Sequence, residues 1–165
     1  INSQGAITIN ANSILVGPGS ASGSNGAGGN VSIVSTGTGT DGLISLNADI
    51  DASGAGTGTG GTLTVKGDSL QLSNAQLVAD GGDEGSGGTL SITTTGSTAM
   101  DWTSAPDGAL SVSGNGSGNS GSITINAQSD LSLNANAFDL DSNESGSGTG
   151  GDITIVCTCD ASCVT

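Results

Sequence analysis

The stretch Gly39–Val65, GTDGLISLNADIDASGAGTGTGGTLTV, contains the pattern on which the fold depends. Two short runs of alternating apolar and polar residues, LISL and ADID, are followed by a glycine-rich run and then by GTLTV. Alternation with a period of two residues is typical of half-buried β-strands. Glycine-rich runs tolerate the positive φ angles that tight corners require. The stretch therefore predicts three short strands separated by turns.

The run GTLTV at the end of this stretch is one of six related copies. Each copy reads glycine, any residue, aliphatic, hydroxyl, aliphatic. The copies are GAITI from Gly5, GNVSI from Gly29, GTLTV from Gly61, GTLSI from Gly88, GSITI from Gly121 and GDITI from Gly151. Successive glycines are 24, 32, 27, 33 and 30 residues apart. A repeat of this length is the mark of a solenoid in which each repeat forms one coil.

We therefore expect an all-β fold, a right-handed parallel β-helix (β-solenoid) with three short strands per coil of about 29 residues. Five full coils plus a partial sixth would form a single domain over residues 1–165, either a whole subunit or a module of a longer or polymerised fibre. The copies supply the first strands. The expected second strands are 13–16, 43–46, 70–72, 109–112 and 130–133, and the third strands lie around Ile50, Leu77 and Phe138.

Alternation within each copy divides its side chains between the interior and the surface. The two aliphatic residues point inward and stack from coil to coil at about 4.8 Å, and burial of each is worth roughly 1.5–3 kcal/mol. The expected inward pairs are Ile7/Ile9, Val31/Ile33, Leu63/Val65, Leu90/Ile92, Ile123/Ile125 and Ile153/Ile155. The expected outward column is Thr8, Ser32, Thr64, Ser91, Thr124 and Thr154.

The charge balance excludes several partners. The chain has 15 acidic residues and one basic residue, Lys66, which gives a net charge of −14. Because no basic surface can neutralise phosphates, we expect no nucleic-acid partner and no attraction to anionic lipids. The sequence also has no apolar run of the length that membrane insertion requires.

The residue inventory argues against catalysis. Without histidine, arginine or tyrosine, a Ser-His-Asp triad, a histidine base and an arginine clamp are impossible. The remaining candidates are the carboxylate pairs Asp49/Asp51 and Asp139/Asp141, whose spacing of roughly 6.5–7 Å along a strand is near that of an inverting glycosidase. Aspartate beside glycine-rich turns is common without chemistry. We expect no enzyme activity, and a carbohydrate-active β-helix enzyme is the alternative.

The repeat pattern resembles that of filamentous haemagglutinin-type exoproteins, which are exported by two-partner secretion. The likeness is carried by GGxIxI, an Asn-Ala step, xIxL and AxIxASG, as in Gly39–Val65, and it covers nearly the whole chain. It implies a right-handed β-helix in a bacterial, extracellular surface filament or adhesin, with a structural rather than a catalytic role. The adhesion target, a carbohydrate or another cell-surface group, stays open.

The two ends of the repeat region are expected to take part in association. The repeat runs from Gly5 to Val156 without a helix, charged cap or proline at either end, and an uncapped strand edge pairs readily with another chain. Either the segment is a passenger segment of a large secreted adhesin, or subunits stack head to tail into a homopolymer that grows without closing. Stacking would place Ile7 and Ile9 against Ile153 and Ile155 of a neighbouring copy.

Three cysteines, Cys157, Cys159 and Cys163, lie together in CTCDASC. In an oxidising setting one pair could form a disulfide in the terminal coil and the third could reach another chain. Three thiols without a histidine leave a zinc shell one ligand short. No basic neighbour is present to lower a thiol pKa for catalysis, and purely structural cysteines are the alternative.

Carboxylates gather after the third strands. Asp51, Asp80 and Asp141 lie 10, 8 and 10 residues before the next anchor glycine. We therefore expect them at one corner of adjacent coils, where repulsion costs about 1 kcal/mol per pair in water. Together with Asp83 and Glu84 they could hold calcium through carboxylate and carbonyl oxygens. A solvated acidic corner is the alternative, and no other cofactor is expected.

Two further features of the sequence each have more than one interpretation. The outward hydroxyl column fits an ice-binding solenoid superficially, but its flanking positions, which include Ala6 and Asn10, do not repeat. Trp102 is expected in a loop, Thr95–Gly108, where it could stack on a sugar or a neighbouring chain, or cover the loop's own apolar residues.

Overall fold

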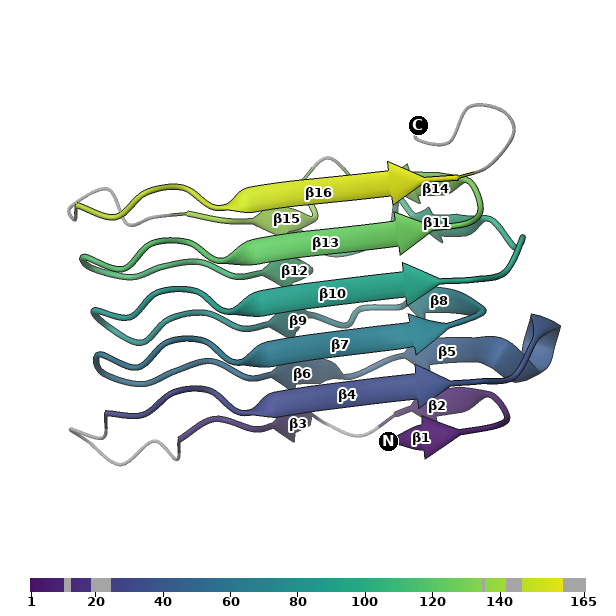
Figure 1. The fold of residues 1–165 in the computed structure, drawn as a ribbon, viewed down its shortest axis with the longest axis horizontal. Helices are drawn as coiled ribbons and strands as arrows, with labels where there is room; N and C mark the ends of the chain where they lie inside the picture. Colours follow the sequence, from purple (N-terminus) through teal and green to yellow (C-terminus); the bar gives the residue numbers. More distant parts are fainter. Residues whose placement is uncertain (11–12, 19–24, 135, 142–146, 159–165) are drawn as a thin grey trace.

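The computed structural model is an all-β solenoid in which three strands recur in every coil (Figure 1). It describes residues 1–10, 13–18, 25–134, 136–141 and 147–158. Coil 1 contains β1 (Asn2–Ser3), β2 (Ile7–Ile9) and β3 (Ser13–Leu15); coil 2 contains β4 (Asn30–Ser35), β5 (Leu43–Leu46) and β6 (Asp49–Asp51); coil 3 contains β7 (Thr62–Gly67), β8 (Ser69–Leu72) and β9 (Leu77–Val78). Coil 4 contains β10 (Thr89–Thr94), β11 (Met100–Trp102) and β12 (Leu110–Ser111); coil 5 contains β13 (Ser122–Ala127), β14 (Leu131–Leu133) and β15 (Phe138–Asp139); β16 (Asp152–Cys157) begins a sixth.

Strands of successive coils pair in parallel to form the faces of the solenoid. Sheet A has the order β1-β4-β7-β10-β13-β16, and sheet C has the order β15-β12-β9-β6-β3. Sheet B is divided into β2-β5-β8 and β11-β14. In Figure 1 the chain crosses the near side from left to right, returns on the far side and rises with each circuit, so the coil is right-handed. The predicted fold class and the five coils with a partial sixth are confirmed.

The first of the six copies lies in a different sheet from the other five. GAITI forms β2 in sheet B, where Ile7 pairs with Ile44 and Ile9 with Leu46, while β1 takes the sheet A position through its pairing with β4. Ile7 and Ile9 therefore do not belong to the inward columns of sheet A, and Thr8 does not belong to its outward column. The error arises because strands of all three sheets share the same alternation, and only the pairing partner distinguishes them.

Two expected second strands are also placed differently. The runs SILV and ALSV contribute β3 and β12, which belong to sheet C. The second strand of coil 4 is instead β11, inside the segment that was expected to be a loop. The coils differ in length both at the corner between sheets A and B and at the corner between sheets B and C, and the sequence pattern does not locate these differences.

Sheet A supplies the most regular part of the core. Leu63, Leu90 and Ile123 lie in register on β7, β10 and β13, and each is at most 1% exposed. The second inward column, two residues further along the strands, is equally regular. Its members are Ile33, Val65, Ile92 and Ile125, all buried. Val31, the coil 2 member of the first column, is half-buried. The columns therefore confirm the predicted aliphatic interior of coils 3 to 5 and the inward position of Ile33 in coil 2.

The glycine-rich corners bring the backbones of successive coils very close together. A Cβ on Gly61, Gly88 or Gly121 would overlap the carbonyl oxygen of the anchor glycine one coil below. A second column, Gly58, Gly85 and Gly118, is packed in the same way. Each corner is closed by its anchor glycine, whose N–H donates to the carbonyl at the end of sheet C: Gly61 to Ala52 at 2.8 Å, Gly88 to Ala79 at 2.7 Å and Gly121 to Val112 at 2.7 Å.

The reason for glycine in these corners therefore differs from the expected one. Positive φ angles occur in the corners only at Gly56 and Gly116 among the described residues. At the anchor positions the requirement is the absence of a side chain, because backbone fills the space that a Cβ would occupy.

Replacement of an anchor glycine tests this close approach. In Gly88→Ala the methyl group must displace backbone, so we expect the free energy of unfolding to fall by about 1–3 kcal/mol or more. Gly150→Ala is the matched control, because no heavy atom lies within 4 Å of the Cβ built there, and it should change stability by less than about 0.5 kcal/mol. Denaturant unfolding measures both. Equal effects of the two substitutions would contradict the close packing of the corners.

Candidate functional site

The polar side chains that the sequence singled out lie mainly at the corner where each coil leaves sheet C. Sheet register places Asp51, Val78, Ser111 and Asp139 in one column. The next outward column continues through the corner by backbone bonds. It contains Ser53, Asp80, Ser113 and Asp141, as indicated by Gly54 N–H to Asp80 O at 2.8 Å, Gly81 to Ser113 at 2.9 Å and Gly114 to Asp141 at 3.0 Å.

This arrangement corrects the predicted acidic cluster. Asp51 and Asp80 occupy different columns, and coil 4 places serines between Asp80 and the acids of coil 5. We refer to Asp51, Ser53, Asp80, Ser111, Ser113, Asp139 and Asp141 as the Ser/Asp corner. The spacing of these acids from the next anchor glycine predicts the correct corner. It does not predict which column of stacked residues each acid occupies.

Asp80 is the central carboxylate of the Ser/Asp corner. Its Oδ1 accepts hydrogen bonds from Ser111 Oγ at 2.6 Å and from Ser113 N at 2.7 Å. Ser113 Oγ in turn donates to Asp139 Oδ1 at 2.9 Å. Burial raises the pKa of Asp80, the bonds from Ser111 and Ser113 oppose this, and the charges of Asp139 and Asp51 add to the rise. The neutral residues Ser111 and Ser113 thus separate the carboxylates of Asp80 and Asp139, which reduces the repulsion between them.

The other two predicted calcium ligands lie at the tip of the corner. Asp83 and Glu84 are exposed, and Glu84 Oε2 accepts from Ser117 N and Ser117 Oγ, both at 3.0 Å. The structure therefore divides the five predicted ligands between the tip and the Ser/Asp corner. Within the described part of the chain, no three acidic or thiol side chains are grouped in a metal-binding arrangement. Calcium binding stays an untested prediction.

Of the three cysteines, the structure describes Cys157, the last residue of β16. It continues an inward column of sheet A, and its Sγ lies 3.6 Å from the carbonyl oxygen of Ser129. Burial raises the pKa of the Cys157 thiol, and the charge of Asp130 adds to this. Cys159 and Cys163 fall outside the described residues, so the disulfide and the link to another chain remain predictions.

The end of the solenoid at β16 presents apolar side chains to solvent. Of the inward side chains of β16, Ile153 is 46% exposed and Ile155 is half-buried. Val156 is 43% exposed, but it points outward, in register with Asn126. Within the described residues, β16 pairs on one edge only, with β13. Ile7 and Ile9 are each only 7% exposed, so they do not form the surface of the other end. Among the described residues of coil 1, the exposed large apolar side chains are Ile1 and Leu15, at 60% and 68%, which the sequence pattern does not indicate.

The outer face of sheet A is rich in hydroxyl groups. Register joins Thr62, Thr89 and Ser122 in the column beside Thr64, Ser91 and Thr124. Asn30 and Asp152 continue this flanking column at its two ends, and Ala6, which precedes β2, lies outside it. The column on the other side is mixed, with Lys66, Thr93 and Asn126. Outward hydroxyl residues are also what β propensity favours, and the ice-binding alternative stays untested.

Trp102 is a core residue, and its predicted place in a loop is wrong. It lies on β11, is 1% exposed, and its indole Nε1 donates to Leu70 O at 3.1 Å. This bond spans the break in sheet B between β8 and β11. The alternation of Met100, Asp101 and Trp102 was the signal for a strand, but the surrounding polar residues obscured it.

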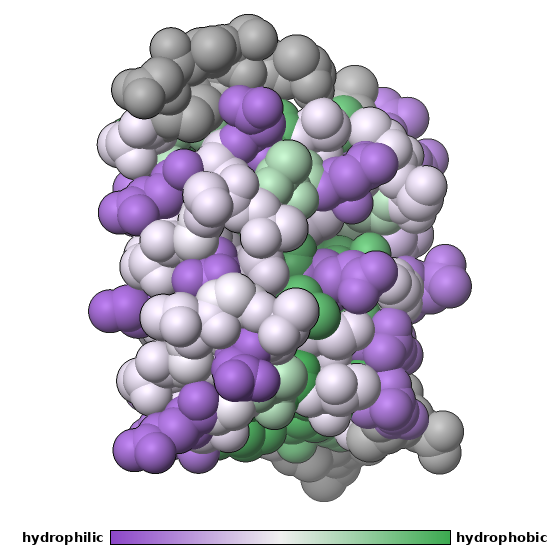
Figure 2. All heavy atoms as spheres, turned by 90° about the vertical axis from the view of Figure 1, so that its right-hand side faces the viewer, coloured by the Kyte–Doolittle hydropathy of each residue, from purple (hydrophilic) through white to green (hydrophobic). Residues whose placement is uncertain are grey.

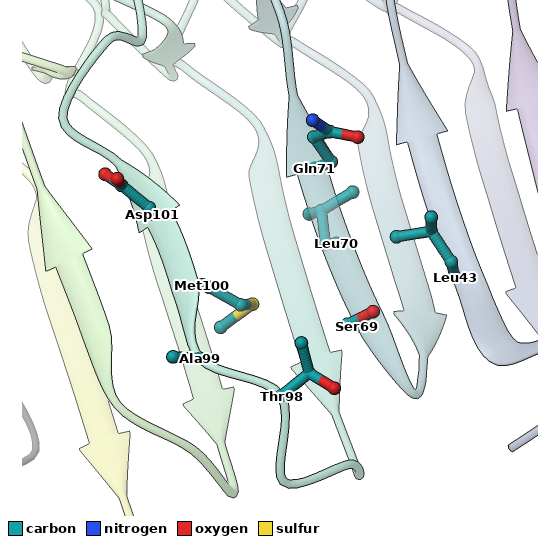
Figure 3. Close-up of a pocket in the computed structure, with 8 residues that line it drawn as sticks. All are labelled: Leu43, Ser69, Leu70, Gln71, Thr98, Ala99, Met100 and Asp101. Carbon is teal, nitrogen blue, oxygen red and sulfur yellow. The ribbon is translucent and has the colours of Figure 1, made fainter. Parts of the chain in front are cut away.

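A shallow groove of about 280 Å³ lies over this break (Figure 3). Figure 3 shows Met100 from β11 and Leu70 from β8 at its floor, with Gln71 and Asp101 at the upper rim.

The side of the molecule toward the viewer in Figure 2 is mostly hydrophilic or neutral, with a broken line of apolar atoms between. No helix among the described residues is long and apolar enough to cross a membrane.

Comparison of the chain with protein-family models, with curated proteins and with solved structures finds no match. The β-solenoid architecture is therefore established by the structure alone, and membership of a family is not shown.

Substitution of Trp102 tests its role at the break in sheet B. Trp102→Phe removes the indole N–H and leaves Leu70 O without this donor, so we expect unfolding free energy to fall by about 1–3 kcal/mol. The measurement is denaturant unfolding followed by circular dichroism. A change below about 0.5 kcal/mol would show that the bond does not join coils 3 and 4.

Proposed function

We propose that the chain is a non-catalytic structural segment of an extracellular surface filament or adhesin of the filamentous haemagglutinin type. Its solenoid is lengthened at β16 by the first coil of a second copy, so that copies stack head to tail. The observation that carries the proposal is the exposure of Ile153, an inward side chain of β16 that is 46% exposed, whereas the corresponding Ile123 of β13 is fully buried.

The packing of the inner coils supports this role for β16. Ile153 is in register with Ile123, which is fully buried because β13 has a coil on each side. A further coil above β16 would bury Ile153 in the same way, and each buried aliphatic side chain contributes roughly 1.5–3 kcal/mol. It would also pair the second edge of the strand, and an unpaired edge is a template for strand addition. A head-to-tail contact of this kind does not close into a ring.

Charge affects the conditions for assembly. Each copy has a net charge of −14, so neighbouring copies repel one another at long range. Salt screens this repulsion, with a Debye length of about 8 Å at physiological ionic strength. Assembly should therefore be stronger at physiological salt than at low salt, the opposite of what a contact driven by opposite charges would show.

The absence of histidine, arginine and tyrosine from the sequence supports the non-catalytic part of the proposal. Both members of the Asp49/Asp51 pair have structural partners: Asp49 Oδ1 accepts from Gln76 N at 2.9 Å and Asp51 Oδ1 accepts from Ser53 N at 2.8 Å. The main alternative is that β16 is followed by further coils of the same polypeptide, as in the passenger segment of a large adhesin.

Two lysine substitutions on β16 test the stacking. In Ile153→Lys a charge is placed on the inward position that a second copy would cover, so we expect the concentration needed for assembly to rise at least about tenfold. Thr154→Lys is the control, because it places the same charge on the same strand at an outward position. Sedimentation velocity over a range of concentrations measures both variants.

A single monomeric species of the unaltered chain at all concentrations would contradict stacking and favour the longer-adhesin alternative. Equal assembly of the two variants would show that the association uses another surface.

A further inference from the structure

We propose that Asn115 is a site of spontaneous deamidation, at which the backbone nitrogen of Gly116 displaces the side-chain amide group as ammonia. The reaction converts a side chain that joins two coils into a carboxylate. It is independent of the proposed function, because it requires only water and the local structure of this glycine-rich corner.

Asn115 and Gly116 are one of two Asn-Gly pairs in the chain, and the other is Asn25 and Gly26. A glycine after asparagine gives the backbone nitrogen its easiest approach to the side-chain Cγ, because glycine has no side chain to obstruct the attack. Sequence alone therefore indicates two sites of equal reactivity, and the structure has to distinguish them.

The reaction proceeds in two steps. The backbone nitrogen forms a bond to Cγ while the bond from Cγ to the amide nitrogen breaks, and ammonia leaves with the proton of the backbone N–H. The product is a five-membered succinimide ring. Water then adds to one of the two ring carbonyl carbons and breaks its bond to the ring nitrogen, which gives aspartate or isoaspartate.

The two pairs differ in whether the attacking nitrogen is already engaged. Gly26 N donates to Ala55 O at 3.1 Å, and Ala55 N donates back to Gly26 O at 2.9 Å, so Gly26 is fixed in an antiparallel bridge. The nitrogen of Gly116, in contrast, donates to no partner among the residues that the structure describes. The nitrogen that must attack is therefore held at Asn25 and available at Asn115.

The conformation around Gly116 also favours attack. Gly118 N donates to Asn115 O at 2.8 Å, which closes a turn over residues 115–118, and the φ of Gly116 is 56°. Glycine in this region can change its backbone angles at little steric cost. Asn115 and Gly116 are both half-buried, so both are partly exposed to the water that completes the reaction.

One hydrogen bond opposes the reaction by holding the Asn115 side chain in place. Its Nδ2 donates to Gly81 O of coil 3 at 2.7 Å. This bond must open before Cγ can meet the Gly116 nitrogen, and a single bond of this kind has a small net stability where water can replace it. It therefore slows the reaction without preventing it, whereas reaction at Asn25 requires a backbone bridge to open.

Both products would weaken the contact between coils 3 and 4. A carboxylate cannot donate to Gly81 O, so two acceptors would face each other where a hydrogen bond now lies. The new charge would also be close to Glu84, whose carboxylate lies against Gly116. Isoaspartate would in addition lengthen the main chain by one atom, close to the point where Gly118 packs against Gly85 O.

The test follows both Asn-Gly pairs of the unaltered chain in mildly alkaline buffer, folded in one sample and unfolded by guanidinium chloride in the other. Peptide mass spectrometry measures the mass increase that replacement of NH2 by OH produces at each asparagine. The two pairs should react at similar rates in the unfolded chain, where only local sequence acts. In the folded chain we expect Asn115 to react several times faster than Asn25.

This comparison needs no variant to fold, and the unfolded sample corrects for differences in local sequence. The proposal is overturned if Asn25 reacts as fast as Asn115 or faster in the folded chain. It is also overturned if folded Asn115 stays unreacted for as long as the unfolded chain takes to react completely.

The effect on the coils is measured with Asn115→Asp, which supplies one of the two products directly. Asn119→Asp is the control, because it adds the same charge to the same coil and its carboxylate can still accept from Thr149 N, as Asn119 Oδ1 does at 3.0 Å. We expect Asn115→Asp to lower the thermal midpoint by several degrees more than the control. Equal midpoints would show that deamidation does not weaken the contact between coils 3 and 4.

Discussion

Contact between the backbones of successive coils at the glycine corners is the constraint on which the rest of the solenoid depends. The carbonyl oxygens of Gly29, Gly61 and Gly88 occupy the space that a side chain would need one coil above. Because the corners stack at backbone contact, the strands that follow them enter sheet A at a fixed register. That register places Leu63, Leu90 and Ile123 in one buried column. The glycines are thus a condition for the aliphatic core rather than flexible connections beside it.

The same stacking explains where contact between successive coils is weakest. Backbone bonds at the corner bring the acids of coils 2, 3 and 5 close together, and Ser111 and Ser113 of coil 4 separate Asp80 from the acids of coil 5. On the opposite side, sheet B is interrupted between β8 and β11, and Trp102 bridges the break through Leu70. At β16 the stacking ends with Ile153 exposed. Each of these features is a place where coil-to-coil contact is incomplete or opposed by charge.

The sequence predicts the architecture well because its period is visible in five glycine-led copies that share one sheet. It predicts individual positions less well, since the same alternation occurs in all three sheets. GAITI was placed in sheet A for this reason, although Ile7 pairs with Ile44 in sheet B. The acids were brought to the correct corner, but the columns of Asp51 and Asp80 depend on coil length, which varies. Trp102 was missed because β11 is short and surrounded by polar residues, so only tertiary contact identifies it as core.

Residue-resolved hydrogen exchange tests the central claim most directly. If the corners are packed backbone against backbone, the amides of Gly61, Gly88 and Gly121, which donate across each corner, should exchange as slowly as those in the centres of β7 and β10. All of them would then open only with global unfolding. Rapid exchange at the three glycines beside protected strands would show that the corners are flexible connections, and it would contradict the account of how the coils are held in register.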